Sequence, residues 1–166
     1  VTETVPDDDV LFIVTADHTQ KLETPDYLTP LGQFRVPLLF FHPQAKFSGV
    51  DTNRVVQQVD ILPSVLDYLQ VQPDRRLLFG KSIFREGEGR AFLHNNGRYW
   101  LVRAQRALEI TPDGRTRLFD LVQDPRLKSP LPVGAESSAA LEQEAKALVQ
   151  YFVNGMIYNN LYDGPP

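Results

Sequence analysis

Residues 10–19 read VLFIVTADHT, and this stretch decides how the rest of the chain is interpreted. Its first six residues, Val10 to Thr15, are nearly all apolar and rich in β-branched side chains. A short continuous apolar run of this kind is typical of a strand buried on both faces of a parallel or mixed sheet. The run ends abruptly at Asp17 and His18, whose oxygen and nitrogen atoms both suit a divalent metal ion. The sequence therefore predicts a strand over residues 10–15 with a polar pair at its carboxyl end.

A second buried strand, VPLLFFH, is predicted over residues 36–42. It follows residues 19–34, which contain two prolines and a glycine and are expected to form a long loop. If the two strands are parallel, His42 ends on the same sheet edge as Asp17, where ligands collect in open α/β sheets.

Residues 60–69 show the apolar spacing of an amphipathic helix. Asp60 is a plausible N-cap, and Pro63 falls in the first turn, where its missing N–H costs little. Residues 70–89 are expected to be mostly loop. The first half of the chain therefore alternates strand and helix, as α/β proteins do.

The pattern changes after residue 89. The turn signals NNG (residues 95–97) and PDG (residues 112–114) separate short apolar runs, which predicts an antiparallel meander over residues 90–120. Residues 137–153 return to helical spacing, with apolar side chains on one face. We therefore expect an α/β fold: part of a doubly wound mixed sheet, a small C-terminal antiparallel meander and a terminal helix.

Composition narrows the class of protein. The 166 residues are 42% hydrophobic and 23% charged, which is ordinary for a globular domain. The formal net charge is −4, which argues against nonspecific nucleic-acid binding. No cysteine is present, so disulfides, thiolate metal ligands and a cysteine nucleophile are excluded. The chain starts at Val1 and its one methionine is Met156, so we expect it to be part of a longer protein.

Several motifs occur in an order that, taken together, is specific. They are ADHT (16–19), FRVPLLF (34–40), VDILPSVL (59–66), FGKS (79–82) and LFDLVQDP (118–125). Over roughly residues 8–125 this order resembles the C-terminal half of sulfatase-family proteins in the alkaline phosphatase superfamily. Within that group it looks most like the lipoteichoic acid synthase and phosphoglycerol transferase branch.

The resemblance implies a metal-dependent enzyme. It implies a divalent ion (Mn, Mg, Ca or Zn) held by Asp17 and His18, which match the family's Asp-His pair. The family's nucleophile and a further acidic ligand lie upstream of the matching part. Residues 1–89 would then be the C-terminal portion of the catalytic domain, and residues 90–166 the meander with the terminal helix. We expect this chain alone to be inactive, with the missing N-terminal half as its partner.

The resemblance also bears on reaction and location. It implies phosphoglycerol-type transfer on phosphate esters outside the cytoplasm, in a parent protein that is membrane-anchored and bacterial. The alternative within the family is hydrolysis of sulfate esters. Sulfatases of this family usually carry a lysine in the loop after the Asp-His pair, and here that loop holds only Lys21, close to His18. His42 and Arg35 are candidate contacts for the phosphate or sulfate group.

A non-enzymatic interpretation remains open beside the two enzymatic ones. The aromatic side chains of the meander, Phe92, Tyr99 and Trp100, could form a core or a platform for glycans. The two predicted strands are apolar on both sides, so a partial protein should expose an apolar face. Self-association of the chain would cover such a face.

Overall fold

The computed structural model describes residues 10–19, 24–45, 47, 49, 51–77, 79–132, 134 and 138–163. By its internal contacts the chain forms two compact units, Val1–Thr52 and Asn53–Pro166. Residues 53–89 thus group with the meander and the terminal helix, whereas the predicted domain boundary lies between residues 89 and 90. No helix among the described residues is long and apolar enough to cross a lipid bilayer.

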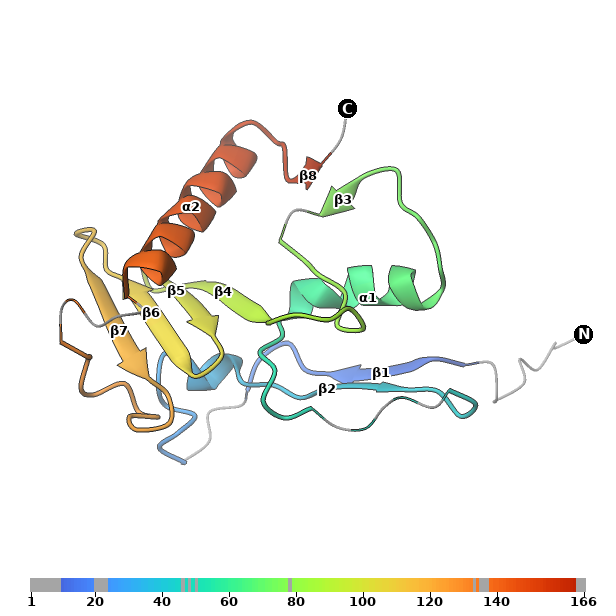
Figure 1. The fold of residues 1–166 in the computed structure, drawn as a ribbon, viewed down its shortest axis with the longest axis horizontal. Coiled ribbons are helices and arrows are strands. Elements are labelled where there is room, and N and C mark those ends of the chain that lie inside the picture. Colours follow the sequence, from blue (N-terminus) through green and yellow to red (C-terminus); the bar gives the residue numbers. More distant parts are fainter. Residues whose placement is uncertain are drawn as a thin grey trace, which may run out of the picture. The chain divides into compact units, whose positions relative to one another are not determined.

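The first unit is built on two strands, β1 (Phe12–Thr15) and β2 (Leu38–Phe41). They pair antiparallel, with Phe12 opposite Phe41 and Thr15 opposite Leu38 (Figure 1). The described residues of the connection, 16–19 and 24–37, contain one short 3-10 turn, Gly32–Phe34, and no α-helix. A parallel pair normally needs a helical crossover, so the chain here simply turns back on itself. The parallel arrangement considered from the sequence is therefore wrong for this pair.

One face of this two-stranded sheet is apolar and exposed. Because side chains alternate along a strand, the facing pairs Phe12–Phe41 and Val14–Leu39 point to the same side. These four side chains are 45–54% exposed. The strands are therefore not buried on both faces within this chain, and the expected exposed apolar face is confirmed.

The second unit contains the predicted meander. Four antiparallel strands lie in the order β4-β5-β6-β7. Their bounds are Arg90–Asn95 (β4), Arg98–Arg103 (β5), Arg106–Ile110 (β6) and Thr116–Asp120 (β7). The β4–β5 turn has positive φ at both Asn96 and Gly97, which is the type I′ geometry predicted from the NNG signal.

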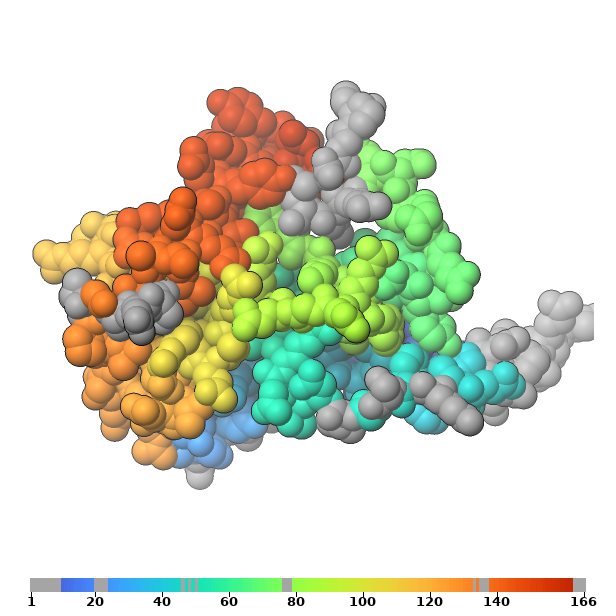
Figure 2. Space-filling model, in the orientation of Figure 1, coloured from blue at the N-terminus to red at the C-terminus, as the bar shows by residue number. Residues whose placement is uncertain are grey.

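The terminal helix α2 (Ser138–Ile157) lies across one face of the meander (Figure 1). Its buried residues Leu141, Ala145 and Leu148 pack on a core that includes Leu101 and Leu108 of the central strands. In Figure 2 the helix (orange to red) lies beside the yellow-green edge strand β4, as the Arg90–Glu144 ion pair requires. The predicted helical stripe is confirmed, and the helix runs four residues further than residue 153.

The remaining elements join the meander to helix α1 (Ile61–Tyr68), which a 3-10 turn, Gln58–Asp60, precedes. After α1, a two-residue strand β3 (Arg76–Leu77) pairs antiparallel with β8 (Tyr162–Asp163) at the end of the chain. Both strands fall in regions expected to be irregular. Two residues give too short a pattern for alternation to be recognised, and their partners lie far apart in sequence.

Candidate functional site

Asp17 and His18 lie directly beyond the end of β1, in the first unit. The backbone N–H of His18 donates to Oδ1 of Asp17 at 2.9 Å, which turns the chain sharply after the strand. The other carboxylate oxygen, Oδ2, lies 3.5 Å from Nε2 of His18. Both side chains are largely exposed, 87% for Asp17 and 69% for His18. The two predicted ligands thus lie side by side and open to solvent.

One ring nitrogen of His18 contacts the backbone. Its Nδ1 lies 2.9 Å from the carbonyl oxygen of Thr19, and because a carbonyl only accepts, Nδ1 carries the hydrogen. The other ring nitrogen, Nε2, is the atom that faces the Asp17 carboxylate. Histidine ligands of metal ions commonly donate the other ring N–H to a backbone carbonyl in this way. The donor chemistry of this pair fits a divalent cation.

The loop after this pair is tied to the 3-10 turn that precedes β2. Both the N–H and the hydroxyl of Thr19 donate to the carbonyl of Gln33, at 3.1 and 3.0 Å. Further along, the Thr29 hydroxyl accepts from the Gly32 N–H at 2.9 Å. A Cβ on Gly32 would lie 2.0 Å from the carbonyl oxygen of Asp26, so this tight turn needs glycine. These bonds fix the position at which the Asp-His pair is held.

The antiparallel pairing separates the two predicted substrate contacts. Arg35 precedes β2 by three residues and so lies at the strand end where Asp17 and His18 lie, with its side chain exposed. His42 follows Phe41, which pairs with the first residue of β1, so His42 lies at the opposite end. Three strand steps of about 3.4 Å separate the two ends. The shared edge expected for His42 and Asp17 is therefore wrong, because it depended on parallel strands.

Two protein donors do not complete a metal site. Structural and catalytic zinc sites use three or four protein ligands, and calcium takes six or more oxygens. Within the part of the chain that the structure describes, no group of three or more His, Asp or Glu side chains is placed to hold one ion. Among the described residues, the Asp17–His18 pair supplies two of the donors that such a site needs.

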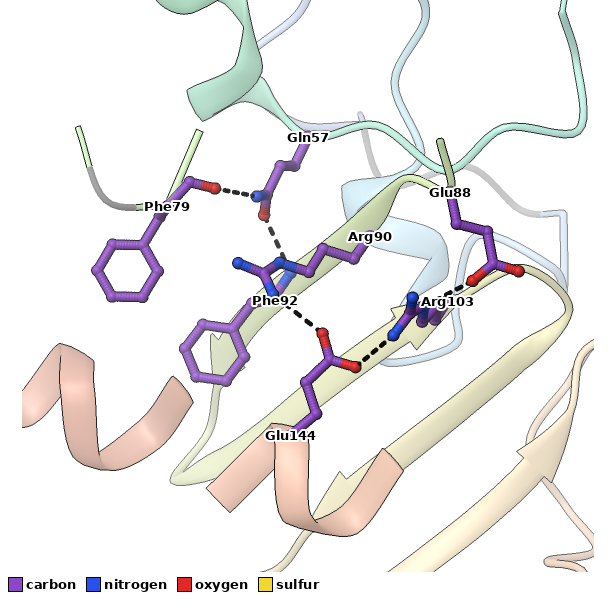
Figure 3. Close-up of polar contacts among 7 residues, drawn as sticks. All are labelled: Gln57, Phe79, Glu88, Arg90, Phe92, Arg103 and Glu144. Carbon is purple, nitrogen blue, oxygen red and sulfur yellow. Dashed lines mark hydrogen bonds and ion pairs between the residues drawn. The ribbon is translucent and has the colours of Figure 1, made fainter. Parts of the chain in front are cut away.

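The second unit holds a polar cluster that the sequence did not indicate (Figure 3). The side-chain amide of Gln57 donates to the carbonyl of Phe79 at 3.0 Å and accepts from the N–H of Phe92 at 3.0 Å. It thereby joins the segment before α1 to the edge strand β4. The partners lie 22 and 35 residues away, so no local pattern could reveal this bond.

Charged residues continue this cluster toward the terminal helix. Glu144 of α2 accepts from Arg90 at 3.0 Å and from Arg103 at 2.7 Å, and Arg103 also donates to Glu88 at 2.7 Å (Figure 3). The charges alternate in sign along the chain of contacts, and each carboxylate meets an arginine. We infer that this cluster holds α2 against β4 and β5, because each of its charged side chains forms an ion pair with another member.

Asp60 is buried, with 6% of its surface exposed. Its carboxylate accepts from the N–H groups of Gln57 and Lys81 at 3.0 and 2.8 Å. Burial raises the pKa of Asp60, while these two backbone donors work in the opposite sense. The residue occupies the N-cap position of α1, but its side chain caps the preceding 3-10 turn instead. Capping was expected here, although not of that turn.

The aromatic residues of the meander form packing contacts. Phe92 and Tyr99 stack with ring centroids 5.8 Å apart, and both pack against the core under α2. Trp100 is only 2% exposed and packs on Phe119, so its ring is not presented for stacking on a sugar. The core interpretation of Trp100 is therefore confirmed, which removes the main support for a glycan platform.

Comparison with known proteins shows what this chain is similar to. Residues 1–71 match the family model described as Sulfatase, and this segment includes Asp17, His18, Arg35 and His42. The chain also has the fold of part of a protein in the alkaline phosphatase superfamily from Vibrio parahaemolyticus, with a TM-score of 0.71 at 18% identity. That match covers 95% of this chain and 37% of the other chain. No curated protein matches the chain significantly.

Proposed function

We propose that these residues form part of a metal-dependent centre that transfers a phosphoryl or sulfuryl group. The observation that carries the proposal is that Oδ2 of Asp17 and Nε2 of His18 lie 3.5 Å apart, inside the segment that matches the Sulfatase family. The remaining ligands and the nucleophile would come from residues outside those described. The chain spans about a third of the related Vibrio protein, which is consistent with such a division.

In this proposal the two side chains have different tasks. Asp17 supplies negative charge that offsets part of the charge of the cation. His18 would supply Nε2, and the contact of Nδ1 with the Thr19 carbonyl orients the ring. Arg35, at the same strand end, would contact a phosphate or sulfate oxygen. When bound, the divalent ion would lower the pKa of the nucleophile and stabilise charge on the transferring group.

Between the two ester classes we favour phosphate esters, with phosphoglycerol-type transfer as the specific reaction. The sequence around Asp17, with threonine at position 19 where many sulfatases carry glycine, supports this choice. Lys21, the one lysine of that loop, lies outside the described residues. Sulfate-ester hydrolysis is the second candidate, favoured by the description of the family model that matches. We propose an extracytoplasmic, membrane-anchored parent protein as the setting for either reaction.

The test is the activity of the intact protein toward phosphate and sulfate esters. A nitrophenyl phosphate, the matching sulfate and phosphatidylglycerol would be assayed with the parent protein and with Asp17→Asn. We expect turnover of a phosphate substrate and its loss, by about 100-fold or more, in the variant. Asp74→Asn makes the same change at an exposed site in the second unit and should keep the parent rate. Full activity of Asp17→Asn would overturn the proposal, and turnover of the sulfate alone would replace it with the second candidate.

A further inference from the structure

A cavity of about 340 Å³ lies beside α1 in the second unit. Its apolar walls come from three side chains of α1, together with Val71 and Tyr162. The α1 residues are Leu62, Pro63 and Leu66. Leu62, Val71 and Tyr162 are each about half exposed, at 51, 47 and 47%, so the cavity is open to solvent. Its volume lies within the range of small-molecule sites, which begins at about 300 Å³.

Hydrogen bonds and close backbone contacts hold the chain in position around this cavity. After α1, the N–H of Val71 donates to the carbonyl of Leu66 at 2.8 Å, and Gln70 adopts a positive φ of 56°. This arrangement turns the chain back and places Val71 beside the helix. A Cβ on Gly80 would lie 2.3 Å from the carbonyl oxygen of Val59, so residues that follow it approach α1 closely. The β3–β8 pairing brings Tyr162 to the same wall.

One pair of charged residues in the wall is already satisfied. Arg85 donates to both oxygens of Asp67, through Nη2 at 2.9 Å and through Nε at 3.3 Å. The Ser82 hydroxyl donates to the same carboxylate at 2.7 Å. Together these donors lower the pKa of Asp67, so the carboxylate stays ionised and the pair is neutral overall.

Two further cations line the cavity, and within the described part of the chain their contacts are with uncharged groups. The guanidinium of Arg75 lies over the ring of Tyr162, 5.7 Å from its centroid. The ammonium of Lys81 donates to the backbone carbonyl of Glu86 at 3.2 Å. Neither contact offsets the positive charge, and both residues lie at the border of an apolar cavity.

We propose that this cavity binds a small amphipathic anion: an alkyl or aryl body that carries one carboxylate, phosphate or sulfonate group. The apolar body would cover Leu62, Leu66 and Val71, and the anionic group would pair with Arg75 and Lys81. A neutral apolar molecule would add no charge opposite to these two cations, and an apolar cation would be repelled by them. This inference concerns the second unit and does not depend on the proposed metal centre.

Octanoate, used as a soluble monomer, is the probe. Binding to the 166-residue chain would be followed by amide chemical shifts and by calorimetry, beside octylammonium, 1-octanol, inorganic phosphate and phosphatidylglycerol vesicles. We expect saturable binding of octanoate alone, with the largest shifts at the amides of Lys81 and Ser82. Binding of octylammonium or octanol with equal affinity, or binding only to vesicles, would overturn the proposal.

Variants test whether the named residues hold the probe. Arg75→Gln and Lys81→Gln should each weaken binding of octanoate about tenfold, the usual effect of losing a charge-assisted contact. The backbone N–H of Lys81, which Asp60 accepts, is kept in that variant. Lys128→Gln removes the same charge at an exposed position and should bind as the parent does.

Leu62→Glu introduces a carboxylate into the cavity at an exposed first-turn position of α1, where a negative charge suits the helix. It should abolish binding while the thermal transition stays unchanged. Leu69→Glu makes the same change at a 58% exposed position of the same segment that does not line the cavity, and should bind octanoate normally. Equal binding by both variants would overturn the proposal.

Discussion

Glu109 places a carboxylate inside the meander, with 1% of its surface exposed. It lies on β6, directly opposite Trp100 of β5 and Arg117 of β7. One oxygen accepts from Arg98 at 2.6 Å and the other from Arg117, and both arginines keep about 40% of their side-chain surface in solvent. A buried charge needs such partners, because its desolvation is otherwise uncompensated.

Because Glu109 is buried and its two arginine partners are partly exposed, removing the arginines should destabilise the fold more than removing the carboxylate. Replacing both arginines, as Arg98→Met with Arg117→Met, leaves an unpaired buried carboxylate and should lower the free energy of unfolding by about 3–5 kcal/mol. Glu109→Gln removes the buried charge and leaves two arginines that water can reach, so it should cost only about 1–2 kcal/mol. Urea unfolding followed by circular dichroism measures both. A larger loss for Glu109→Gln than for the double variant would contradict this assignment.

For single residues, the sequence indicated a site where polar side chains directly follow an apolar strand. Asp17 and His18 could be placed at a strand end because the apolar run before them is continuous. The burial of Glu109 could not be foreseen, since its arginine partners lie on neighbouring strands and the register is set by tertiary packing. The same holds for Gln57, whose two partners lie in distant segments.

At the C-terminal end of α1, the residue type at position 70 does not suit the backbone conformation found there. Gln70 has a φ of 56°, and the hydrogen bonds of Gln70 and Val71 to Asp67 and Leu66 form the terminal motif that normally uses glycine. A side chain in this left-handed region costs roughly 1–2 kcal/mol relative to glycine, which is partly offset by the greater entropy of glycine in the unfolded chain. Gln70→Gly should therefore raise the free energy of unfolding by about 0.5–1 kcal/mol, measured by urea titration. Gln72→Gly, at an exposed position two residues later, should give no gain.

The contact between α2 and the meander is tested by two alanines of the same helix. Ala145 is 1% exposed and packs in the core cluster, whereas Ala147 is exposed. Ala145→Leu should overfill the core and lower the free energy of unfolding by about 1–3 kcal/mol. Ala147→Leu adds the same atoms in solvent and should stay within about 0.5 kcal/mol of the parent. Equal effects in thermal unfolding would show that α2 does not pack as described.

Elements were predictable where local chemistry specifies them. The Asn96–Gly97 turn and the stripe of α2 follow from backbone conformation and helical spacing. The β5–β6 turn uses Ala104 with a positive φ, a residue that gives no turn signal. The direction of β2 relative to β1 was not specified either, because an apolar run looks the same in a parallel and an antiparallel pair.

For the whole molecule, the exposed face of β1 and β2 predicts association. We propose that further residues of the intact protein cover this face, and that a second copy covers it when the chain is studied alone. Sedimentation velocity of the chain should then show mass that rises with concentration. Val14→Lys with Leu39→Glu replaces a facing apolar pair by opposite charges and should leave a monomer.

A matched variant separates this face from general stickiness. Val122 and Leu69 are also exposed, at 63 and 58%, but lie in the second unit. Val122→Lys with Leu69→Glu makes the same chemical change there and should associate as the parent chain does. Loss of association in this control, or a parent chain that stays monomeric, would contradict the role of the β1–β2 face.

We propose that Asp17 and His18 are metal ligands in the intact protein. The metal content of that protein tests this directly. The purified intact protein would be analysed by mass spectrometry of bound metals, beside Asp17→Asn and His18→Gln. Asp74→Asn and His94→Gln repeat these changes at exposed positions of the second unit. We expect a divalent metal in the parent and both controls, and its loss from Asp17→Asn and His18→Gln without loss of folding. A metal-free parent, or full occupancy in either site variant, would contradict it.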